Sequence, residues 1–198
     1  MSHHKQIINR LEQVKCLLLD DMPIDSDLVE VLDIHLKTIL EITPEQETIQ
    51  LNSSPGSVIR IWSDGACTGN PGPGGWGTII IVDGNIQELS GRSQRTTNNI
   101  MEMTGALEGI KRTPEGSSII LTSDSQYLVK GMTQWLKNWK KKGWKKADGN
   151  EVLNRDLWMK LDQESQKRNI QWIWIKGHAG HPENERCDEL ARKAITRR

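Results

Sequence analysis

Two apolar segments of this chain end in the same dipeptide, Ser-Asp, and this repetition constrains the fold more than any other feature. The segments are Ile61–Asp64 (Ile-Trp-Ser-Asp) and Leu121–Asp124 (Leu-Thr-Ser-Asp). Short apolar runs bounded by polar residues are typical of buried strands. Functional sites in open α/β sheets form where the carboxyl ends of neighbouring strands meet. The repetition therefore predicts two adjacent strands that bring Asp64 and Asp124 close together.

The residues around this pair predict a complete order of strands and helices. Apolar patterning and turn or cap residues indicate three strands, a helix, a fourth strand, further helices, a fifth strand and a closing helix. A right-handed helical crossover would place the fourth strand parallel to the first. We therefore expect an α/β fold with a mixed five-stranded sheet, in which an antiparallel three-strand meander joins two parallel strands and helices cover both faces. The expected elements are strands 58–62, 76–82, 86–94, 119–121 and 170–175, and helices from 97, from 125, over 151–166 and over 183–197.

Composition divides the chain into two parts. Residues 1–57 contain four basic and ten acidic residues, a net charge of −6, and no Trp, Tyr or Phe, whereas residues 58–198 carry +6 and all eight tryptophans. Apolar residues at helical spacing predict an acidic helical hairpin over 1–42, and residues 43–57 have the composition of a linker. The basic part indicates a polyanionic partner. The hairpin would either dock on the basic domain, pair with a second copy or be a dispensable extension.

Several protein classes are disfavoured by the composition. The chain lacks an apolar run of the roughly 18 residues that a membrane helix needs, and its start does not resemble a secretory signal. The three cysteines are an odd number without CxxC spacing, which favours reduced thiols over a disulfide framework or a zinc site. We therefore expect a cytoplasmic protein without membrane association, with a basic domain that is monomeric.

Two further acidic residues can join the aspartate pair. Glu102 lies early in the helix expected after Thr97, and Asp188 lies early in the closing helix. Carboxylates that are close together repel one another unless protons or cations bridge them. Oxygen ligands suit Mg²⁺, which binds one or two carboxylates together with substrate phosphates. Four such groups could hold two ions for an in-line phosphoryl displacement.

Four motifs then resemble bacterial type-1 ribonuclease H, in order and with matching intervals, over about residues 58–195. The first opens the domain, the second contains Glu102, the third contains Asp124 and the last contains Asp188. These segments are Ser63–Gly77 (SDGACTGNPGPGGWG), Thr97–Met103 (TNNIMEM), Thr122–Tyr127 (TSDSQY) and Lys176–Leu190 (KGHAGHPENERCDEL).

The resemblance implies an Mg²⁺-dependent endonuclease that hydrolyses the RNA strand of RNA/DNA hybrids and leaves 5′-phosphate and 3′-hydroxyl ends. It implies that Asp64, Glu102, Asp124 and Asp188 hold two metal ions, with Mn²⁺ as an alternative ion. His178 lies in a Gly- and Ala-rich loop, and histidine can move a proton near neutral pH. The resemblance assigns it a role as proton shuttle or as an aid to product release.

Hybrid binding is expected from two groups of residues. Segment 135–146 contains six lysines and three tryptophans, and lysines neutralise phosphates independently of sequence. It resembles the basic protrusion of the family, in which Trp135, Trp139, Lys140, Lys141, Lys142 and Trp144 would contact the DNA strand or support that contact. Matching family positions also assign substrate contacts to Cys67, Asn70, Thr97, Asn98, Asn99 and Gln126.

Two other functions remain open from the residues alone. A related nuclease or integrase could act on DNA or double-stranded RNA, but the Asn98-Asn99 pair and the basic segment argue against it. A non-catalytic hybrid-binding protein is the alternative from a different class, and the four carboxylates with His178 argue against that.

Overall fold

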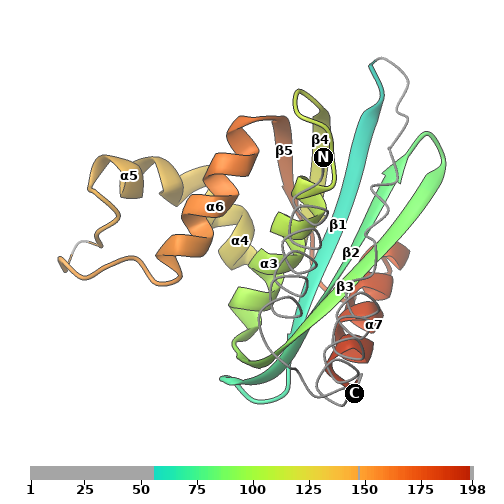
Figure 1. Ribbon diagram of the computed structural model, residues 1–198, viewed down its shortest axis with the longest axis horizontal. Coiled ribbons are helices and arrows are strands. Elements are labelled where there is room, and N and C mark those ends of the chain that lie inside the picture. The colour runs from blue at the N-terminus through green and yellow to red at the C-terminus, as the bar shows by residue number, and fades with distance from the viewer. Residues whose placement is uncertain (1–55, 147, 197–198) are drawn as a thin grey trace, which may run out of the picture. The chain divides into compact units, whose positions relative to one another are not determined.

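A five-stranded mixed sheet forms the centre of the domain in the computed structural model, which describes residues 56–146 and 148–196 (Figure 1). The predictions for the hairpin over 1–42 and for the linker up to residue 55 lie outside the described residues. The strands are β1 (Val58–Cys67), β2 (Gly72–Val82), β3 (Asn85–Thr96), β4 (Ser118–Ser123) and β5 (Asn169–Trp174). The helices are α3 (Asn98–Lys111), α4 (Gln126–Lys130), η1 (Gly131–Trp135), α5 (Leu136–Lys141), α6 (Arg155–Gln166) and α7 (Pro182–Thr196).

The strand order is β3-β2-β1-β4-β5. The first three strands pair antiparallel, and β4 pairs parallel with both β1 and β5. This arrangement confirms the predicted fold class. The register pairs Trp62 with Thr122, so that Asp64 and Asp124, each two residues further along, leave this strand pair at the same level.

Helices α3 and α7 cover opposite faces of the sheet. Consecutive residues of a strand point to opposite faces, and two consecutive residues of β2 contact these two helices. The Thr78 hydroxyl donates a hydrogen bond to the Gly105 carbonyl of α3 at 2.7 Å. A Cβ atom on the preceding residue, Gly77, would lie 2.2 Å from the Cys187 carbonyl oxygen of α7. Glycine therefore allows α7 to approach β2 closely. Buried side chains from β1, β2, β4, α3 and α6 make one apolar core, in which Trp158 is fully buried.

The structure differs from the predicted element boundaries in three places. Strand β1 continues past Asp64 to Cys67, and β2 begins at Gly72 inside the glycine-rich segment that was expected to be a loop. The residues that lengthen β1 and β2 pair with one another, Ala66 with Gly75 and Cys67 with Gly74. Helix α6 begins at Arg155 rather than at residue 151, because Glu151 forms a bridge with Lys145 and Asn154 has a left-handed backbone (φ 60°).

The helix expected after Ser125 is divided into α4, the π-helix η1 and α5. The Leu136 N–H donates to the Gly131 carbonyl, five residues back, where an α-helix would use a carbonyl four residues back. A Cβ atom on Gly131 would lie 2.1 Å from the Trp158 ring. The change in helical winding thus occurs where the chain passes directly over the largest side chain of the core.

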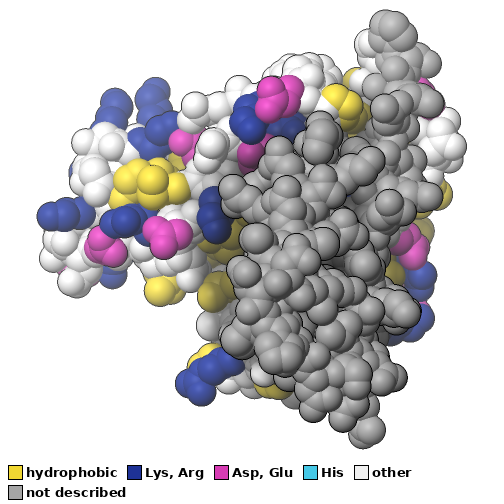
Figure 2. All heavy atoms as spheres, viewed as in Figure 1, with side chains coloured by type: hydrophobic (Ala, Val, Ile, Leu, Met, Phe, Trp, Pro, Cys, Tyr) yellow, Lys and Arg dark blue, Asp and Glu magenta, His cyan; other side chains and the backbone are white. Residues whose placement is uncertain are grey.

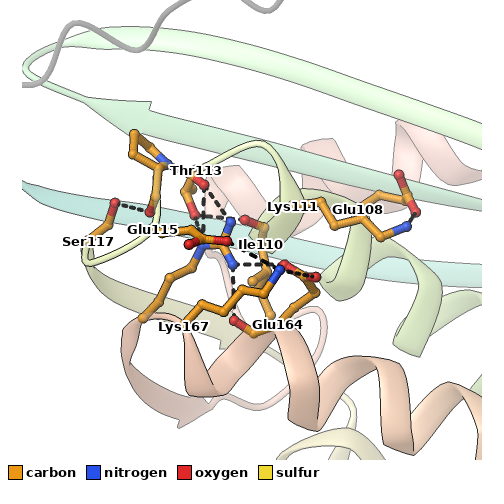
Figure 3. A network of polar contacts seen from close by, with 10 residues as sticks. Glu108, Ile110, Lys111, Thr113, Glu115, Ser117, Glu164 and Lys167 are labelled. Atoms are coloured by element: carbon orange, nitrogen blue, oxygen red, sulfur yellow. Dashed lines mark hydrogen bonds and ion pairs between the residues drawn. The ribbon is translucent and has the colours of Figure 1, made fainter. Parts of the chain in front are cut away.

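A hydrogen-bonded network joins the end of α3 to the turn between α6 and β5 (Figure 3). Arg168 has a side chain that is 4% exposed, and its guanidinium donates to the Thr113 carbonyl at 2.6 Å and to the Thr113 hydroxyl at 2.8 Å. It also pairs with Glu164 at 2.9 Å. This buried cation is therefore fully engaged, and it connects segments that are 55 residues apart. Among the helices of the described residues, none has the length and apolar character needed to cross a membrane.

Candidate active site

All four predicted carboxylates line one open cleft of about 620 Å³, together with His178. The cleft lies beside the ends of β1 and β4 and is bordered by α3, the loop after β5, and α7. Asp64 and Asp188, which are 124 positions apart in the sequence, therefore meet at one site. The structure thus brings together the complete set of side chains that were predicted to perform catalysis.

Asp64 on β1 and Glu102 on α3 lie on elements that pack closely, because Gly65, the residue at their contact, has no side chain. Asp64 is buried on β1, and its Oδ1 accepts a hydrogen bond from the Gly65 N–H at 2.7 Å. A Cβ atom on Gly65 would lie 2.3 Å from the Glu102 nitrogen, so that the first turns of α3 rest directly on the β1 backbone. Thr97 caps this helix, as its hydroxyl accepts a hydrogen bond from Ile100 N–H at 3.4 Å.

Glu102 is oriented by two neutral donors. The Asn98 amide donates to Oε1 at 2.9 Å, and the Ser125 hydroxyl donates to Oε2 in a short hydrogen bond. Ser125 also caps α4 by accepting from Leu128 N–H at 3.2 Å. Both carboxylate oxygens of Glu102 are thus held in place by side chains from the starts of α3 and α4.

Asp124 follows β4 and is held by residues of α7 and of the end of β5. The buried Asn184 amide donates to Asp124 Oδ2 at 3.2 Å, and the Trp174 indole N–H donates to the Asp124 carbonyl at 3.0 Å. A Cβ atom on Gly177 would lie 2.5 Å from Asp124 Oδ2. Glycine at 177 therefore lets the loop after β5 pass beside the carboxylate.

Asp188 reaches the cleft from α7 and pairs with a cation. The Arg192 guanidinium, one helical turn further along, donates from Nε to Asp188 Oδ1 at 2.8 Å. The pair is partly open to solvent, with side-chain exposures of 22% for Asp188 and 65% for Arg192. Arg192 itself lines the cleft.

The electrostatics of the cleft favour a bound cation. Burial, followed by the neighbouring charges of Asp124, Asp188 and Glu102, raises the pKa of the Asp64 carboxyl to about 7, and the hydrogen bond from the Gly65 N–H acts against this rise. Burial likewise raises the pKa of Glu102, while its hydrogen bond from Ser125 acts in the opposite direction. Burial therefore disfavours the ionised form of both carboxylates, and a cation bound beside them would favour it.

The donor set fits Mg²⁺, because every predicted ligand offers carboxylate oxygen. Across residues 56–146 and 148–196, no three Asp, Glu, His or Cys side chains converge closely enough to enclose a metal ion by themselves. Mg²⁺ normally keeps several waters and completes its shell with substrate phosphates, so that a dispersed set of carboxylates around an open cleft suits it better than a closed cage.

His178 lies on the loop between β5 and α7 and is exposed at the edge of the cleft. Its backbone is left-handed, with φ of 52°. The other histidine of this loop, His181, is half-buried and its ring centroid lies 6.0 Å from that of Trp62. His181 thus packs against the sheet, whereas His178 is the imidazole that faces the cleft.

The residues predicted to contact substrate near the cleft differ in their positions. Cys67 and Asn98 line the cleft, and the Asn70 amide oxygen accepts from the Asn98 N–H at 3.3 Å, which connects the loop after β1 to α3. Thr97 uses its hydroxyl as a helix cap. Four of the predicted residues do not line the cleft: Asn70, Thr97, Asn99, which lies in the first turn of α3, and Gln126, which accepts from Lys130 within α4 at 2.8 Å.

The basic segment forms a protrusion that comprises α5 and the loop to residue 146. Lys and Arg side chains gather on this side of the molecule in Figure 2. Trp135 and Trp139 are half-buried and lie 5.6 Å apart between ring centroids, and Trp139 lies 5.4 Å from buried Trp158. Trp144 packs on the core. The tryptophans therefore support the protrusion from beneath.

The lysines of the protrusion are not equivalent. Lys140 Nζ forms an ion pair with Asp162 of α6 at 2.6 Å, where the Asp162 side chain is 15% exposed. Lys141 and Lys142 are exposed on the neighbouring positions. Lys140 is therefore partly neutralised within the protein, a difference from Lys141 and Lys142 that the sequence did not reveal.

Three residues that hold the carboxylates were not among the site residues predicted from the sequence: Ser125, Asn184 and Arg192. The sequence predicted a helix that begins at residue 125, but not the hydrogen bond from Ser125 to Glu102. Arg192 could have been found from its position four residues after Asp188 on a helix, because residues at this spacing are neighbours. Asn184 offered no comparable local signal, since its partner Asp124 is 60 residues away.

Comparisons with known proteins agree with this architecture. Residues 56–196 match the family model for RNase H. Ribonuclease H of Pelobacter propionicus is 48% identical over 153 residues, which cover 77% of this chain and 94% of that protein. Ribonuclease H of Syntrophotalea carbinolica is 52% identical over 143 residues, which cover 72% of this chain and 94% of that protein.

Two solved structures extend the comparison to three dimensions. LC9-RNase H1, a type 1 RNase H with the type 2 active-site motif, superposes with a TM-score of 0.63 at 31% identity, covering 73% of this chain and 74% of that chain. LC11-RNase H1 in complex with an RNA/DNA hybrid superposes with a TM-score of 0.53 at 25% identity, covering 69% and 96%.

Proposed function

The chain belongs to the ribonuclease H family, and on that premise we propose that it hydrolyses the RNA strand of RNA/DNA hybrids in the cleft formed by its four carboxylates. The observation that carries this proposal is the meeting of Asp64, Glu102, Asp124 and Asp188 in one open cleft, on a domain that also carries a basic protrusion. The relatives that match it are named ribonuclease H, and one structural neighbour was solved with a hybrid.

The four carboxylates would hold two Mg²⁺ ions, with Mn²⁺ as an alternative. When bound, the ions would activate the attacking water and stabilise the leaving oxygen, so that 5′-phosphate and 3′-hydroxyl ends result. The role of the protein is to hold the ligands still. Neutral donors keep Glu102 and Asp124 oriented, and the backbone of Gly65 orients Asp64.

His178 would move the proton that the reaction requires. Its imidazole lies on an exposed loop at the edge of the cleft, where it can reach a phosphate oxygen or the leaving hydroxyl without being locked in the core. Histidine titrates near neutral pH and can therefore both accept and return a proton. Because the site remains open, the same side chain can assist release of the product.

Selection of RNA over DNA would come from the polar residues at the start of α3 and the loop after β1. The RNA 2′-hydroxyl both donates and accepts hydrogen bonds in a shallow minor groove. Asn98 and Cys67 line the cleft together with Glu102, and Asn70 accepts a hydrogen bond from the Asn98 N–H. Thr97, Asn99 and Gln126 would add further contacts to the substrate. The Asn98 amide is bonded to Glu102, so that a residue which contacts the RNA strand also touches a metal ligand.

The deciding experiment offers one end-labelled RNA strand to the full-length protein in magnesium buffer. The strand is paired with DNA, paired with RNA or left single-stranded. Asp124→Asn removes a carboxylate charge from the cleft, and the matched control Asp156→Asn removes one from an exposed site on α6, where Asp156 is 85% exposed. We expect cutting of the hybrid alone, loss in Asp124→Asn and retention in Asp156→Asn.

Other outcomes favour other functions. Cutting of the RNA duplex or of DNA would identify a related nuclease with a different substrate. Hybrid binding without cutting would identify a recognition protein and would contradict the proposed chemistry. Retained activity in Asp124→Asn would remove this residue from the site.

Residues 1–57 are proposed to form a separate region, with a hairpin over 1–42 and a linker over 43–57, ahead of a monomeric catalytic domain over 58–198. The net charge of −6 supports docking on the basic domain or self-association through the hairpin. Deletion of residues 1–57 should tighten hybrid binding at low salt, if the hairpin docks on the basic domain, or change the oligomeric state in solution, if the hairpin pairs with a second copy. If neither quantity nor the thermal stability changes, both versions are wrong. The free thiols of Cys67 and Cys187 support action in the reducing cytoplasm.

A further inference from the structure

Three of the four carboxylates in the cleft are held by neutral groups, whereas the fourth is held by a full positive charge. Asp64 accepts from a backbone N–H, Glu102 from an amide and a hydroxyl, and Asp124 from an amide. A neutral donor orients a carboxylate and leaves its charge in place. Asp188 instead pairs with the Arg192 guanidinium at 2.8 Å, which offsets the charge that would attract a metal ion.

Arg192 is also part of the cleft wall. Among the described residues that line the cleft, it is the only lysine or arginine, and it faces four carboxylates. Its side chain is 65% exposed and lies on the last turns of α7, so that the guanidinium can leave Asp188 without disturbing the core. A bound divalent cation and a guanidinium compete for the same negative charge.

We propose that Arg192 is a positioning residue that acts as the resident counter-cation of Asp188 and weakens metal binding there until substrate arrives. This inference rests on the proposed function, in which Asp188 is a metal ligand. The guanidinium occupies Asp188 Oδ1 in the free enzyme and is displaced when a divalent cation binds. Once displaced, it remains at the rim of the cleft, where its positive charge can meet an incoming phosphate.

The test measures Mg²⁺ affinity in the absence of any nucleic acid. Full-length protein is titrated with MgCl₂ and followed by NMR through the backbone amides of Gly65 and Glu102. Arg192→Gln removes the charge but keeps much of the length, and Arg192→Lys keeps the charge. Lys193→Gln is the matched control, because it removes a positive charge from the next residue of α7, which pairs with Glu189 and does not line the cleft.

We expect Arg192→Gln to bind Mg²⁺ roughly three- to tenfold more tightly, a range suited to a partly exposed ion pair. Arg192→Lys should resemble the parent protein, and Lys193→Gln should change the affinity less than twofold, as roughly expected for a screened surface charge. Unchanged or weaker Mg²⁺ binding in Arg192→Gln would overturn the proposal. Equal tightening in Lys193→Gln would also overturn it, because the effect would then be one of net charge.

Failure of the proposed function can be recognised separately. The double variant Asp188→Asn/Arg192→Gln should lose the gain in affinity if Asp188 is the group from which Arg192 is displaced. If the double variant keeps that gain, Arg192 acts elsewhere and the proposal is wrong, whereas hybrid cleavage by the parent protein would leave the ribonuclease function intact. Absence of cleavage together with the expected Mg²⁺ changes would contradict the function but not the competition at Asp188.

Discussion

Gly65 lies so close to the first turns of α3 that a Cβ atom on it would come within 2.3 Å of the backbone nitrogen of Glu102. The next nearest atoms are also backbone atoms, of Met101 and Glu102, which cannot move aside as a flexible side chain would. This contact sets the separation between β1, which carries Asp64, and α3, which carries Glu102. The geometry of two predicted metal ligands therefore depends on the absence of a side chain at residue 65.

Gly65→Ala should therefore damage both the fold and the site. The added methyl must push α3 away from β1, which costs at least about 3 kcal/mol of unfolding free energy, at the upper end of what overpacking usually costs. Gly84→Ala is a suitable control, because Gly84 has φ of 80° but no atom within 4 Å of its Cβ position, so that it bears backbone strain alone. Urea unfolding measures both, and equal destabilisation of the two variants would contradict this account.

The pH dependence of metal-free stability should reveal the raised pKa of Asp64. The folded-state pKa is about 7, and the ordinary value is 3.8. Below pH 3.8 the carboxyl is protonated in both the folded and the unfolded state, so that its raised pKa does not change the free energy of unfolding. As pH rises from about 4 to about 7, the folded state alone retains the proton, so that a destabilisation accumulates and is complete above pH 7.

Asp64→Asn removes this destabilisation and should stabilise the protein in EDTA at pH 8, by on the order of 2–4 kcal/mol, and by much less at pH 4. Thermal unfolding across this range measures the difference, with exposed Asp156→Asn as the control. Added MgCl₂ should stabilise the parent protein more at pH 8 than at pH 5.5, because Asp64 must lose its proton to bind metal. A pH-independent gain in Asp64→Asn would show that Asp64 is ionised without cost.

Lys140 and Lys141 should contribute unequally to hybrid binding, because Asp162 already pairs with Lys140. In an inactive Asp124→Asn background, Lys141→Gln should make the slope of log affinity against log salt less negative by up to about 0.9, the value for one lost phosphate contact. Lys140→Gln should change it less. Fluorescence polarisation with a labelled hybrid measures both slopes, and a larger effect for Lys140→Gln would show that the Asp162 pair opens in the complex.

Arg168 should matter for stability and not for chemistry, because it joins Thr113, just after α3, to the turn before β5 and does not line the cleft. Arg168→Gln should cost about 2–3 kcal/mol, since the loss leaves the Thr113 carbonyl without its charged donor and removes one of the two cations that pair with Glu164. Lys167→Gln, which removes a more exposed cation from the adjacent position, should cost less than about 1 kcal/mol. Cleavage at low temperature should be unchanged in both, and a selective loss of activity in Arg168→Gln would contradict the assignment.

Local patterning predicted much of the fold and the identity of the reactive groups. Apolar runs that end in Ser-Asp identified β1 and β4, and the apolar patterning after Thr97 identified α3. Boundaries were less well predicted. Strand β1 runs past Asp64 because its last residues pair with the glycines of β2, and a glycine-rich segment does not reveal by itself that another strand will lie beside it.

The sequence by itself determined which side chains can bind metal, move a proton or neutralise phosphate, because these are properties of residue types and of their order along strands and helices. Only the tertiary structure decided which partner holds each one. Ser125 meets Glu102 across 23 residues, Asn184 meets Asp124 across 60, and Asp162 meets Lys140 across 22. Such contacts depend on how strands and helices pack, and packing is set by close approaches such as that of Gly65 to α3, whose consequences appear only when the whole chain is folded.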